Sequence, residues 1–361
     1  MTKYERRPSR EVRIGRVVIG GNRPIAVQSM TNTDTKDTEA CVRQIERIFR
    51  AGGPIVRLTA QGCREGENLQ RIVRRLREEG CDAAVVADIH FVPEVAAIAA
   101  KYVDKVRINP GNYNSSHGEF EALIDQCRER GVAIRIGVNH GSLSKRVFDE
   151  WGDTPEGMVA SAMEFLRVCR EKAFDQVVVS MKSSNTRVMV AAYRLLVDAM
   201  EREGMDYPLH LGVTEAGTPT MGILKSAMGI GGLLCLGLGD TVRVSLTADP
   251  AEEVRAAKQI LSAAGVRRFG PNLISCPTCG RTEIDLIGLA QEVERRLRTE
   301  NAPIKVAVMG CAVNGPGEAR EADIGIAGGD GCALIFKKGQ IIKKVPESEV
   351  LDSLMEEIDK L

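Results

Sequence analysis

The chain has 361 residues, which is long enough for two domains or for one large barrel with an appended domain. Its 49 lysines and arginines balance 49 aspartates and glutamates, so no overall charge attracts nucleic acid or a membrane surface. The N-terminal ten residues contain no apolar segment, and no run of about 18 apolar residues occurs. We therefore expect a cytoplasmic protein that is neither exported nor membrane-spanning, whose ten cysteines do not form a disulfide framework.

The first 265 residues predict a repeated unit, in which a short β-branched strand is followed by a polar loop and an amphipathic helix. A hairpin over residues 12–25 precedes the repeats and is expected to plug one end of the structure. Eight units predict an α/β fold, a (β/α)8 TIM barrel; an open doubly wound sheet is the alternative, but no Gly-x-Gly-x-x-Gly motif follows the first strand. The strands are expected at residues 25–29, 55–59, 83–88, 105–109, 133–138, 176–181, 209–214 and 241–246.

Polar and charged residues gather at the carboxyl ends of these strands, where a (β/α)8 barrel places its active site. Several stand two residues apart, so the strand period turns both members of a pair toward the barrel interior. Five of them are cations, which need an anion of comparable charge because burying a lone cation is costly. Guanidinium groups match phosphate oxygens, so the predicted ligand is a diphosphate or bisphosphate. The predicted binding residues are Arg57, Arg107, Asn109, Arg135, Asn139, Lys182, Arg243 and Ser245.

Two residues near the same strand ends are candidates for proton transfer. Glu215 is expected at the mouth of the cation-rich pocket, where a carboxylic acid can protonate a departing oxygen. His90 is the second candidate, with a hydrogen-bonded core histidine as its alternative. Glu215 could instead pair with an arginine, and any single strand arginine could pair with a carboxylate at the closed end of the barrel.

From residue 266 the pattern changes to a small α+β domain, which we expect to span residues 266–361. The domain is predicted to contain helices at residues 283–298 and 347–360 and strands at residues 304–309, 323–326, 333–337 and 341–345.

Three cysteines of this domain have the arrangement of metal ligands. Cys276 and Cys279 form a Cys-x-x-Cys turn, and Cys311 follows the strand at residues 304–309 on a Gly-rich loop that also carries Glu318. Three thiolates suit three corners of an iron–sulfur cluster, with Glu318 as a weak, exchangeable ligand of a fourth iron. A structural zinc site closed by Cys332 is the alternative, and the cysteine pattern alone does not decide between them.

The join between the two domains also predicts an assembly. The eighth helix, at about residues 250–264, returns the chain to the face opposite the strand ends. The linker at residues 265–275 would use nearly all of its reach in folding back along the barrel. A head-to-tail homodimer, in which each cluster domain caps the partner's barrel mouth, is therefore expected.

The chain resembles the 4-hydroxy-3-methylbut-2-enyl diphosphate synthases, bacterial iron–sulfur enzymes of the methylerythritol phosphate route to isoprenoids. The resemblance covers essentially the whole chain and includes both cysteine motifs and the segments Gln28 to Asn32, Arg107 to Gly111, Arg135 to Asn139 and Thr214 to Gly217. It implies a homodimer with a substrate-binding barrel, a structural role for Cys332, and a [4Fe-4S] cluster held by Cys276, Cys279, Cys311 and Glu318.

The resemblance further implies a two-electron reductive ring opening and dehydroxylation of 2-C-methyl-D-erythritol 2,4-cyclodiphosphate. Flavodoxin or ferredoxin would deliver the electrons singly. The cations would hold the diphosphate, Glu318 would leave the iron to admit substrate, and Glu215, with His90, would protonate the leaving hydroxyl. Two other functions are weighed: a phosphate-ligand barrel with a structural zinc module and no redox chemistry, and a nucleic-acid partner, against which the neutral net charge argues.

Overall fold

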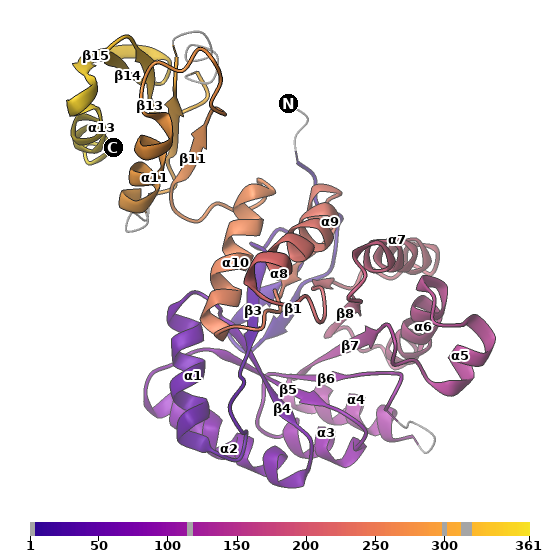
Figure 1. Ribbon diagram of the computed structural model, residues 1–361. Helices are drawn as coiled ribbons and strands as arrows, with labels where there is room; N and C mark the ends of the chain where they lie inside the picture. Colours follow the sequence, from indigo (N-terminus) through magenta and orange to yellow (C-terminus); the bar gives the residue numbers. More distant parts are fainter. Residues whose placement is uncertain (1–3, 114–117, 298–301, 312–319) are drawn as a thin grey trace. The chain divides into compact units, whose positions relative to one another are not determined.

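The computed structural model describes residues 4–113, 118–297, 302–311 and 320–361. The chain divides into two compact units, Met1–Arg267 and Arg268–Leu361 (Figure 1). Within the described ranges, no helix has the length and apolar character needed to cross a membrane.

The first unit is built on a parallel eight-stranded barrel with helices on its outer side (Figure 1). The hydrogen-bonded strand order is β8-β7-β6-β5-β4-β3-β10-β9, and a parallel bridge between Val179 of β8 and Leu209, just before β9, completes the ring. The predicted (β/α)8 barrel is therefore confirmed, and the open doubly wound sheet is excluded. The strands are β3 (Ala26–Met30), β4 (Ile55–Ala60), β5 (Ala84–Ile89), β6 (Lys105–Ile108), β7 (Ala133–Asn139), β8 (Val177–Lys182), β9 (His210–Leu211) and β10 (Thr241–Val242).

The last two strands are shorter than the sequence predicted, with two residues each in place of the six expected. The extended path continues for one more hydrogen bond, from the Arg243 amide to the Leu211 carbonyl at 2.9 Å. The Leu246 amide then donates to the carboxylate of Glu253 at 3.1 Å. A side chain of the next helix therefore accepts the hydrogen bond of a backbone amide, which would have bonded to a neighbouring strand if β10 were longer.

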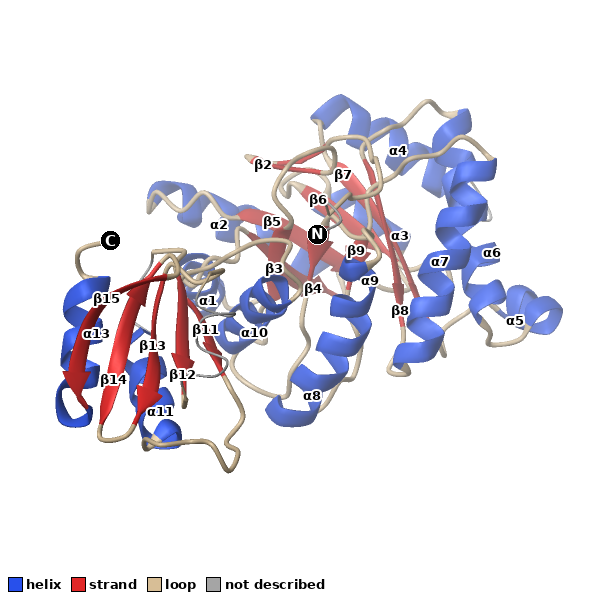
Figure 2. Cartoon of the chain, turned by 90° about the horizontal axis from the view of Figure 1, so that it is seen from above, coloured by secondary structure: helices blue, strands red, loops and turns tan. Residues whose placement is uncertain are grey.

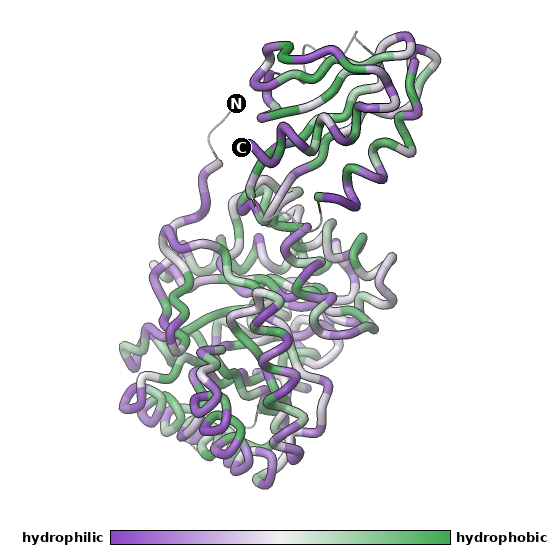
Figure 3. Tube along the Cα trace, turned by 90° about the vertical axis from the view of Figure 1, so that its left-hand side faces the viewer, coloured by the Kyte–Doolittle hydropathy of each residue, from purple (hydrophilic) through white to green (hydrophobic). Residues whose placement is uncertain are grey.

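Amphipathic helices surround the barrel, and hydrophilic and hydrophobic positions alternate along them (Figure 3). In α1, for example, Cys41, Val42, Ile45 and Ile48 are buried. The sequence did not predict α5, which begins after the Ser144 cap, or the π-helical turn η1. The helices are α1 (Thr38–Arg50), α2 (Cys63–Glu78), α3 (Pro93–Ala99), α4 (Glu119–Arg130), α5 (Lys145–Trp151), α6 (Pro155–Glu171), α7 (Thr186–Arg202), α8 (Pro219–Ser226), η1 (Ala227–Gly231), α9 (Gly232–Cys235) and α10 (Pro250–Ala263).

An N-terminal hairpin closes the end of the barrel where the strands begin. It consists of β1 (Val12–Ile14) and β2 (Val17–Ile19) in antiparallel pairing. Its apolar side chains form one buried cluster with the first inward residues of the strands, among them Ala26, Ile55 and Val178. The predicted plug is therefore present, and any ligand must enter from the carboxyl ends of the strands.

The second unit is a five-stranded sheet in the order β11-β12-β13-β14-β15, with β11, β12 and β13 parallel and the last two antiparallel (Figure 2). Residues of α11 and α13 pack with one face of the sheet in a single apolar cluster. The strands are β11 (Asn272–Ser275), β12 (Lys305–Met309), β13 (Ile324–Gly329), β14 (Cys332–Lys337) and β15 (Gln340–Pro346); the helices are α11 (Leu286–Leu297), η2 (Glu347–Glu349) and α13 (Val350–Ile358).

One part of the predicted linker is wrong. Residues 265–275 were expected to be a linker, but Asn272–Ser275 pairs in parallel with β12 as an edge strand of the second unit. Both end residues of this strand are exposed, so it lacks the buried alternation by which strands are recognised in a sequence. The segment between α10 and the second sheet is correspondingly shorter than predicted.

Candidate functional site

Cationic side chains from neighbouring strands converge inside the upper half of the barrel. We define the cation ring as Arg57 of β4, Arg107 of β6, Arg135 of β7, Lys182 of β8 and Arg243, which follows β10. The first four are buried, and Arg135 is completely buried. The sequence therefore predicted the members of this ring correctly as inward-facing residues.

Asp88 of β5 is the carboxylate at the centre of the ring. It accepts a hydrogen bond from Arg107 Nη1 at 2.9 Å, and Arg57 Nε lies 3.6 Å from its second oxygen. Burial alone would raise the pKa of Asp88, but these two guanidinium groups hold the pKa well below its usual value. Asp88 is therefore ionised and fixes the two arginines in place.

Two guanidinium groups of the ring have N–H groups that lack good hydrogen-bond acceptors. Arg57 directs Nε and Nη2 at the thioether of Met30, 3.2 and 3.0 Å away, which is a weak acceptor. Burial lowers the pKa of Arg57 to about 10, so it still carries its charge at neutral pH. Arg135 Nε and Nη1 have no hydrogen-bond partner among the described residues. Unpaired buried N–H groups are costly, which indicates an anionic ligand at this position.

Arg243 is the ring member that already forms a two-point ion pair with a carboxylate. Its Nη2 and Nε lie 3.1 and 3.3 Å from the carboxylate of Glu253, which is buried on α10. Ser29 Oγ donates to the same carboxylate at 2.8 Å. The predicted alternative, a carboxylate at the closed end of the barrel, is not realised for Arg243, because Glu253 lies in the first turn of α10, directly after β10. Asp88 and Glu253 do not balance the five cations.

The remaining predicted ligand-binding residues lie around this ring. Asn109 donates to Ser142 Oγ at 2.9 Å and accepts from the Gly111 amide at 3.2 Å, which fixes its side chain. Asn139 Oδ1 is buried and has no partner among the described residues. Ser245 stands two residues beyond Arg243 and is partly buried. Burial lowers the pKa of Lys182 well below its usual value, and the nearby cations Arg57 and Arg135 lower it further.

The two proton-transfer candidates differ in their surroundings. His90 Nε2 lies 2.9 Å from Arg107 Nη1, which can only donate, and Nδ1 lies 3.2 Å from the side-chain nitrogen of Asn112. Glu215 is exposed, and its backbone has a φ of 51°, in the left-handed region that non-glycine residues rarely adopt. Its loop bonds to Ser183 after β8 and to Thr247 after β10, at the same barrel end as the ring.

The second unit places two of the predicted thiols at the carboxyl ends of adjacent parallel strands. Cys276 directly follows β11, and Cys311 follows β12 after Gly310. The Gly310 amide donates to Cys276 Sγ at 3.2 Å. An N–H donor to sulfur stabilises a thiolate, which is the form that binds metal. These two positions therefore fit cluster ligands.

Cys279 is exposed on the turn after Cys276. The backbone amide of Arg281 and the positive charge of that residue lower the pKa of the Cys279 thiol, which also favours a thiolate. Among the described residues, no three Cys, His, Asp or Glu side chains are grouped closely enough to hold a single metal ion. Thiolates around one zinc ion must approach more closely than those around a four-iron cluster. Glu318, the predicted fourth ligand, lies outside the described residues.

Comparison with known proteins gives matches over both units. The family model described as the GcpE TIM-barrel domain matches residues 9–258, and that of the GcpE protein C-terminal domain matches residues 272–360. The chain belongs to the GcpE family. It is 49% identical over 358 residues to a protein of Clostridium perfringens, covering 99% of both chains, and 48% identical over 356 residues to one of Fusobacterium nucleatum, covering 98% of both. Both relatives are named 4-hydroxy-3-methylbut-2-en-1-yl diphosphate synthase (flavodoxin).

Sequence reasoning missed several residues that shape the site of this GcpE protein. A Cβ at Gly137 would lie 2.6 Å from Arg107 Nε, and one at Gly212 would lie 2.8 Å from Lys182 Nζ. A glycine inside a β-branched strand indicates the close approach of another group, so both positions carried a signal. Glu253 also carried one, because it is a charged residue on the buried face of an amphipathic helix.

Replacement of Gly212 by alanine is expected to weaken anion binding. The new methyl group would also lie 2.9 Å from the Arg243 carbonyl, so Lys182 must move away from the ring. Overpacking of this kind costs about 1–3 kcal/mol. If anion binding requires Lys182 to return to its crowded position, this cost lowers the affinity by roughly 5- to 150-fold. Calorimetric titration with the cyclic diphosphate measures the effect. Gly232→Ala is the control, since a Cβ there would meet nothing within 4 Å; equal affinities of the two variants would contradict the steric role.

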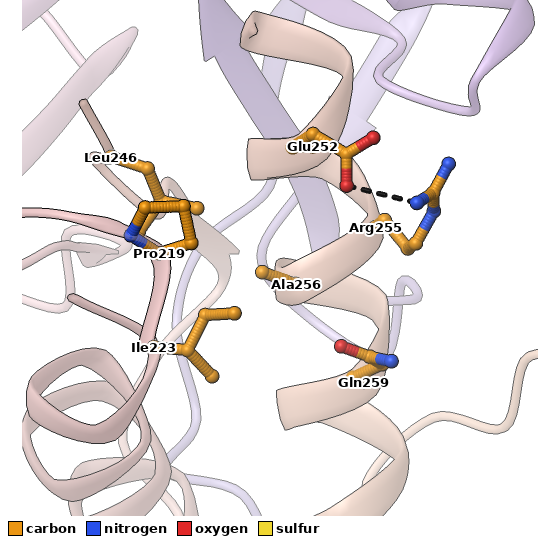
Figure 4. A pocket seen from close by; sticks show the side chains of 7 residues that line it. All are labelled: Pro219, Ile223, Leu246, Glu252, Arg255, Ala256 and Gln259. Atoms are coloured by element: carbon orange, nitrogen blue, oxygen red, sulfur yellow. Dashed lines mark hydrogen bonds and ion pairs between the residues drawn. The ribbon is translucent and has the colours of Figure 1, made fainter. Parts of the chain in front are cut away.

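A pocket on the outer side of the barrel, between α8 and α10, is a different kind of feature (Figure 4). Pro219 and Ile223 line one side of it, and Ala256 and Gln259 line the other. The charges in its wall pair with each other, with Arg255 Nη1 2.9 Å from the Glu252 carboxylate (Figure 4). The pocket therefore offers no unpaired charge to a ligand, unlike the cation ring.

Proposed function

We propose that this chain is an iron–sulfur oxidoreductase that converts 2-C-methyl-D-erythritol 2,4-cyclodiphosphate into 4-hydroxy-3-methylbut-2-enyl diphosphate. The observation that carries the proposal is the ring of buried cations, whose N–H groups outnumber the acceptors around them, in a chain whose relatives are named for this diphosphate product. The reaction opens the cyclic diphosphate at a carbon–oxygen bond with two electrons and releases a hydroxyl group as water.

The cation ring binds the diphosphate and stabilises its charge. When the carbon–oxygen bond breaks, the electron pair stays on the phosphate oxygen, so negative charge increases at the ring. Arg57 and Arg107 are held in position by Asp88 before substrate arrives, which avoids reorganisation during the reaction. His90 contributes by accepting from Arg107, and Asn109, Asn139 and Ser245 supply polar contacts at the rim.

A cluster of the [4Fe-4S] type would be held by Cys276, Cys279 and Cys311, with Glu318 as the fourth ligand. When bound, it supplies single electrons and an iron that lacks a thiolate. The amide donor to Cys276 Sγ and the lowered pKa of Cys279 support this ligand set. Flavodoxin, which the names of the relatives include, or ferredoxin is the proposed reductant.

Glu215 is proposed as the proton donor to the leaving hydroxyl. Its strained backbone, with a φ of 51°, places an exposed carboxyl group at the open end of the barrel. Glu215→Gln keeps the shape but removes the acid, so kcat is expected to fall by about 10²- to 10⁴-fold while substrate affinity changes little. Single-turnover kinetics and calorimetry measure the two effects. Glu129→Gln, at the exposed end of α4, is the control; unchanged kcat in Glu215→Gln would exclude the role.

We also propose a homodimer in the cytoplasm, in which the cluster domain of one subunit serves the barrel of the other. The support is the short connection between α10, which ends at Ala263, and β11, which begins at Asn272. Light scattering of the purified protein measures the mass directly. A subunit-mixing assay tests the shared site, because a cluster-deficient variant and a barrel-deficient variant should regain activity together.

One experiment tests the function as a whole. Protein purified without air is analysed for iron, acid-labile sulfide and zinc, and is then supplied with reductant and the cyclic diphosphate. About four irons and four sulfides per chain, with formation of the linear diphosphate, are expected. One tightly bound zinc without iron would instead support a phosphate-ligand barrel with a structural zinc module.

A further inference from the structure

A second set of polar residues lies inside the barrel beneath the cation ring. It consists of five residues. Each stands on the same strand as a residue at the level of the ring, two positions before it, and because side chains alternate along a strand, it also points into the barrel. All five are at most 1% exposed. We call this set the inner polar layer, and it comprises Gln28, Lys105, Ser180, His210 and Thr241.

The inner polar layer is short of hydrogen-bond partners. Lys105 Nζ lies 3.4 Å from Gln28 Oε1, on a strand that is not its neighbour, which places the amino group inside the barrel. Both ring nitrogens of His210 lack a partner, as do Gln28 Nε2, Ser180 Oγ and Thr241 Oγ1, within the described part of the chain. These groups therefore have donors and acceptors to spare at the centre of the barrel.

The charges that face Lys105 are mostly of its own sign. Arg135 and Arg57 repel it, and His210 experiences the same two arginines together with Lys182 and Lys105. Arg107 and Arg243 complete the ring above, Asp88 and Glu253 are its carboxylates, and Asp104, beside Lys105 in sequence, pairs with Arg77. In the described residues, no carboxylate lies within ion-pair distance of Lys105 Nζ.

We propose that the barrel takes up protons when the diphosphate binds, and that Lys105, with His210 in the same layer, receives them. The inference rests on the proposed function, because the anion is the proposed substrate. In the free barrel, burial lowers the pKa values of Lys105 and His210 well below their usual values, and the arginines, which remain protonated, lower them further. A dianion in the ring cancels the net positive charge there, so Lys105 and His210 bind protons more readily.

Proton uptake by the inner polar layer would change the charge beneath the cation ring. Fixed arginines recognise the anion, while a group that takes up a proton on binding adds attraction only after the anion has entered. The free protein thereby avoids part of the repulsion among buried cations. The same proton-loaded layer lies beneath the phosphate oxygens when negative charge increases during ring opening.

Calorimetric titration in buffers of different ionisation enthalpy tests the inference. Each phosphorus of the cyclic diphosphate carries one strongly acidic oxygen, so the ligand does not titrate near neutral pH and any proton taken up belongs to the protein. Trimetaphosphate, which is also fully ionised there, serves as a second probe anion. Net uptake is expected with the wild-type protein, and Lys105→Met should reduce it by up to about one proton per site.

Two variants complete the design. Lys105→Gln repeats the test with a polar side chain, and Lys101→Met, exposed and four residues earlier, is the control that should match the wild type. Anion binding without proton uptake, or uptake unchanged in both Lys105 variants, would overturn the inference. Uptake with trimetaphosphate but no binding of the cyclic diphosphate would support the inference and reject the proposed substrate. Failure of both anions to bind would overturn both the inference and the proposed substrate.

Discussion

Cys311→Ser is expected to lose most of its iron and acid-labile sulfide and, with them, reductive turnover. The thiol is buried at the end of β12, beside the strand end that carries Cys276, so no other described thiol replaces it. Changes in groups that merely orient ligands cost 10- to 100-fold, so direct loss of a ligand should exceed about 100-fold in activity. Metal and sulfide analysis together with the visible spectrum measure the loss.

Cys332→Ser is the matched control for this prediction. Cys332 begins β14, and its pairing with Gly329 places it toward the same end of the sheet as Cys311. If it is structural, Cys332→Ser keeps iron, sulfide and turnover. Full iron content in Cys311→Ser, or loss of iron in Cys332→Ser, would contradict the proposed ligand set, and the second result would restore the alternative that Cys332 binds metal.

The barrel and its cation ring could be predicted from the sequence because both depend on regular residue spacings. Two-residue alternation in β6 turns Lys105 and Arg107 inward and leaves Val106 and Ile108 to face the helices. The prediction considered only the residues at the carboxyl ends of the strands, and this was sufficient to identify Arg107 as a member of the ring. It missed Lys105, because this residue stands at the beginning of β6.

Other features depend on contacts that no local pattern encodes. The early end of β10 follows from Glu253, a helix residue that takes the Leu246 amide and pairs with Arg243. The contact between His90 and Arg107 joins residues that are 17 positions apart in sequence. The role of Glu318 and the assignment of Glu215 as the acid stay predictions. Glu318 lies outside the described residues, and only chemistry on the loaded protein tests what the two residues do.

Arg135→Met is expected to impair binding and to stabilise the free protein. The guanidinium group is completely buried, and two of its nitrogens lack acceptors, so the empty barrel bears an unbalanced charge that a methionine removes. Replacing poorly paired buried charges by apolar groups can gain about 1–4 kcal/mol of unfolding free energy. Removing one partner of a buried charged contact costs about 2–5 kcal/mol in binding, or roughly 30- to 5,000-fold in affinity for the cyclic diphosphate.

The opposite signs of these two effects separate a binding role from a structural one. A residue that mainly holds the barrel together would lower both stability and affinity when replaced, whereas a residue that awaits an anion raises the first and lowers the second. Denaturant unfolding of the free protein and calorimetry with the substrate measure the pair, and the exposed Arg130→Met, at the end of α4, should change neither. A destabilised Arg135→Met that binds the cyclic diphosphate normally would mean that the internal contacts of the barrel already satisfy this arginine. The anion site would then have to be built from the other members of the ring.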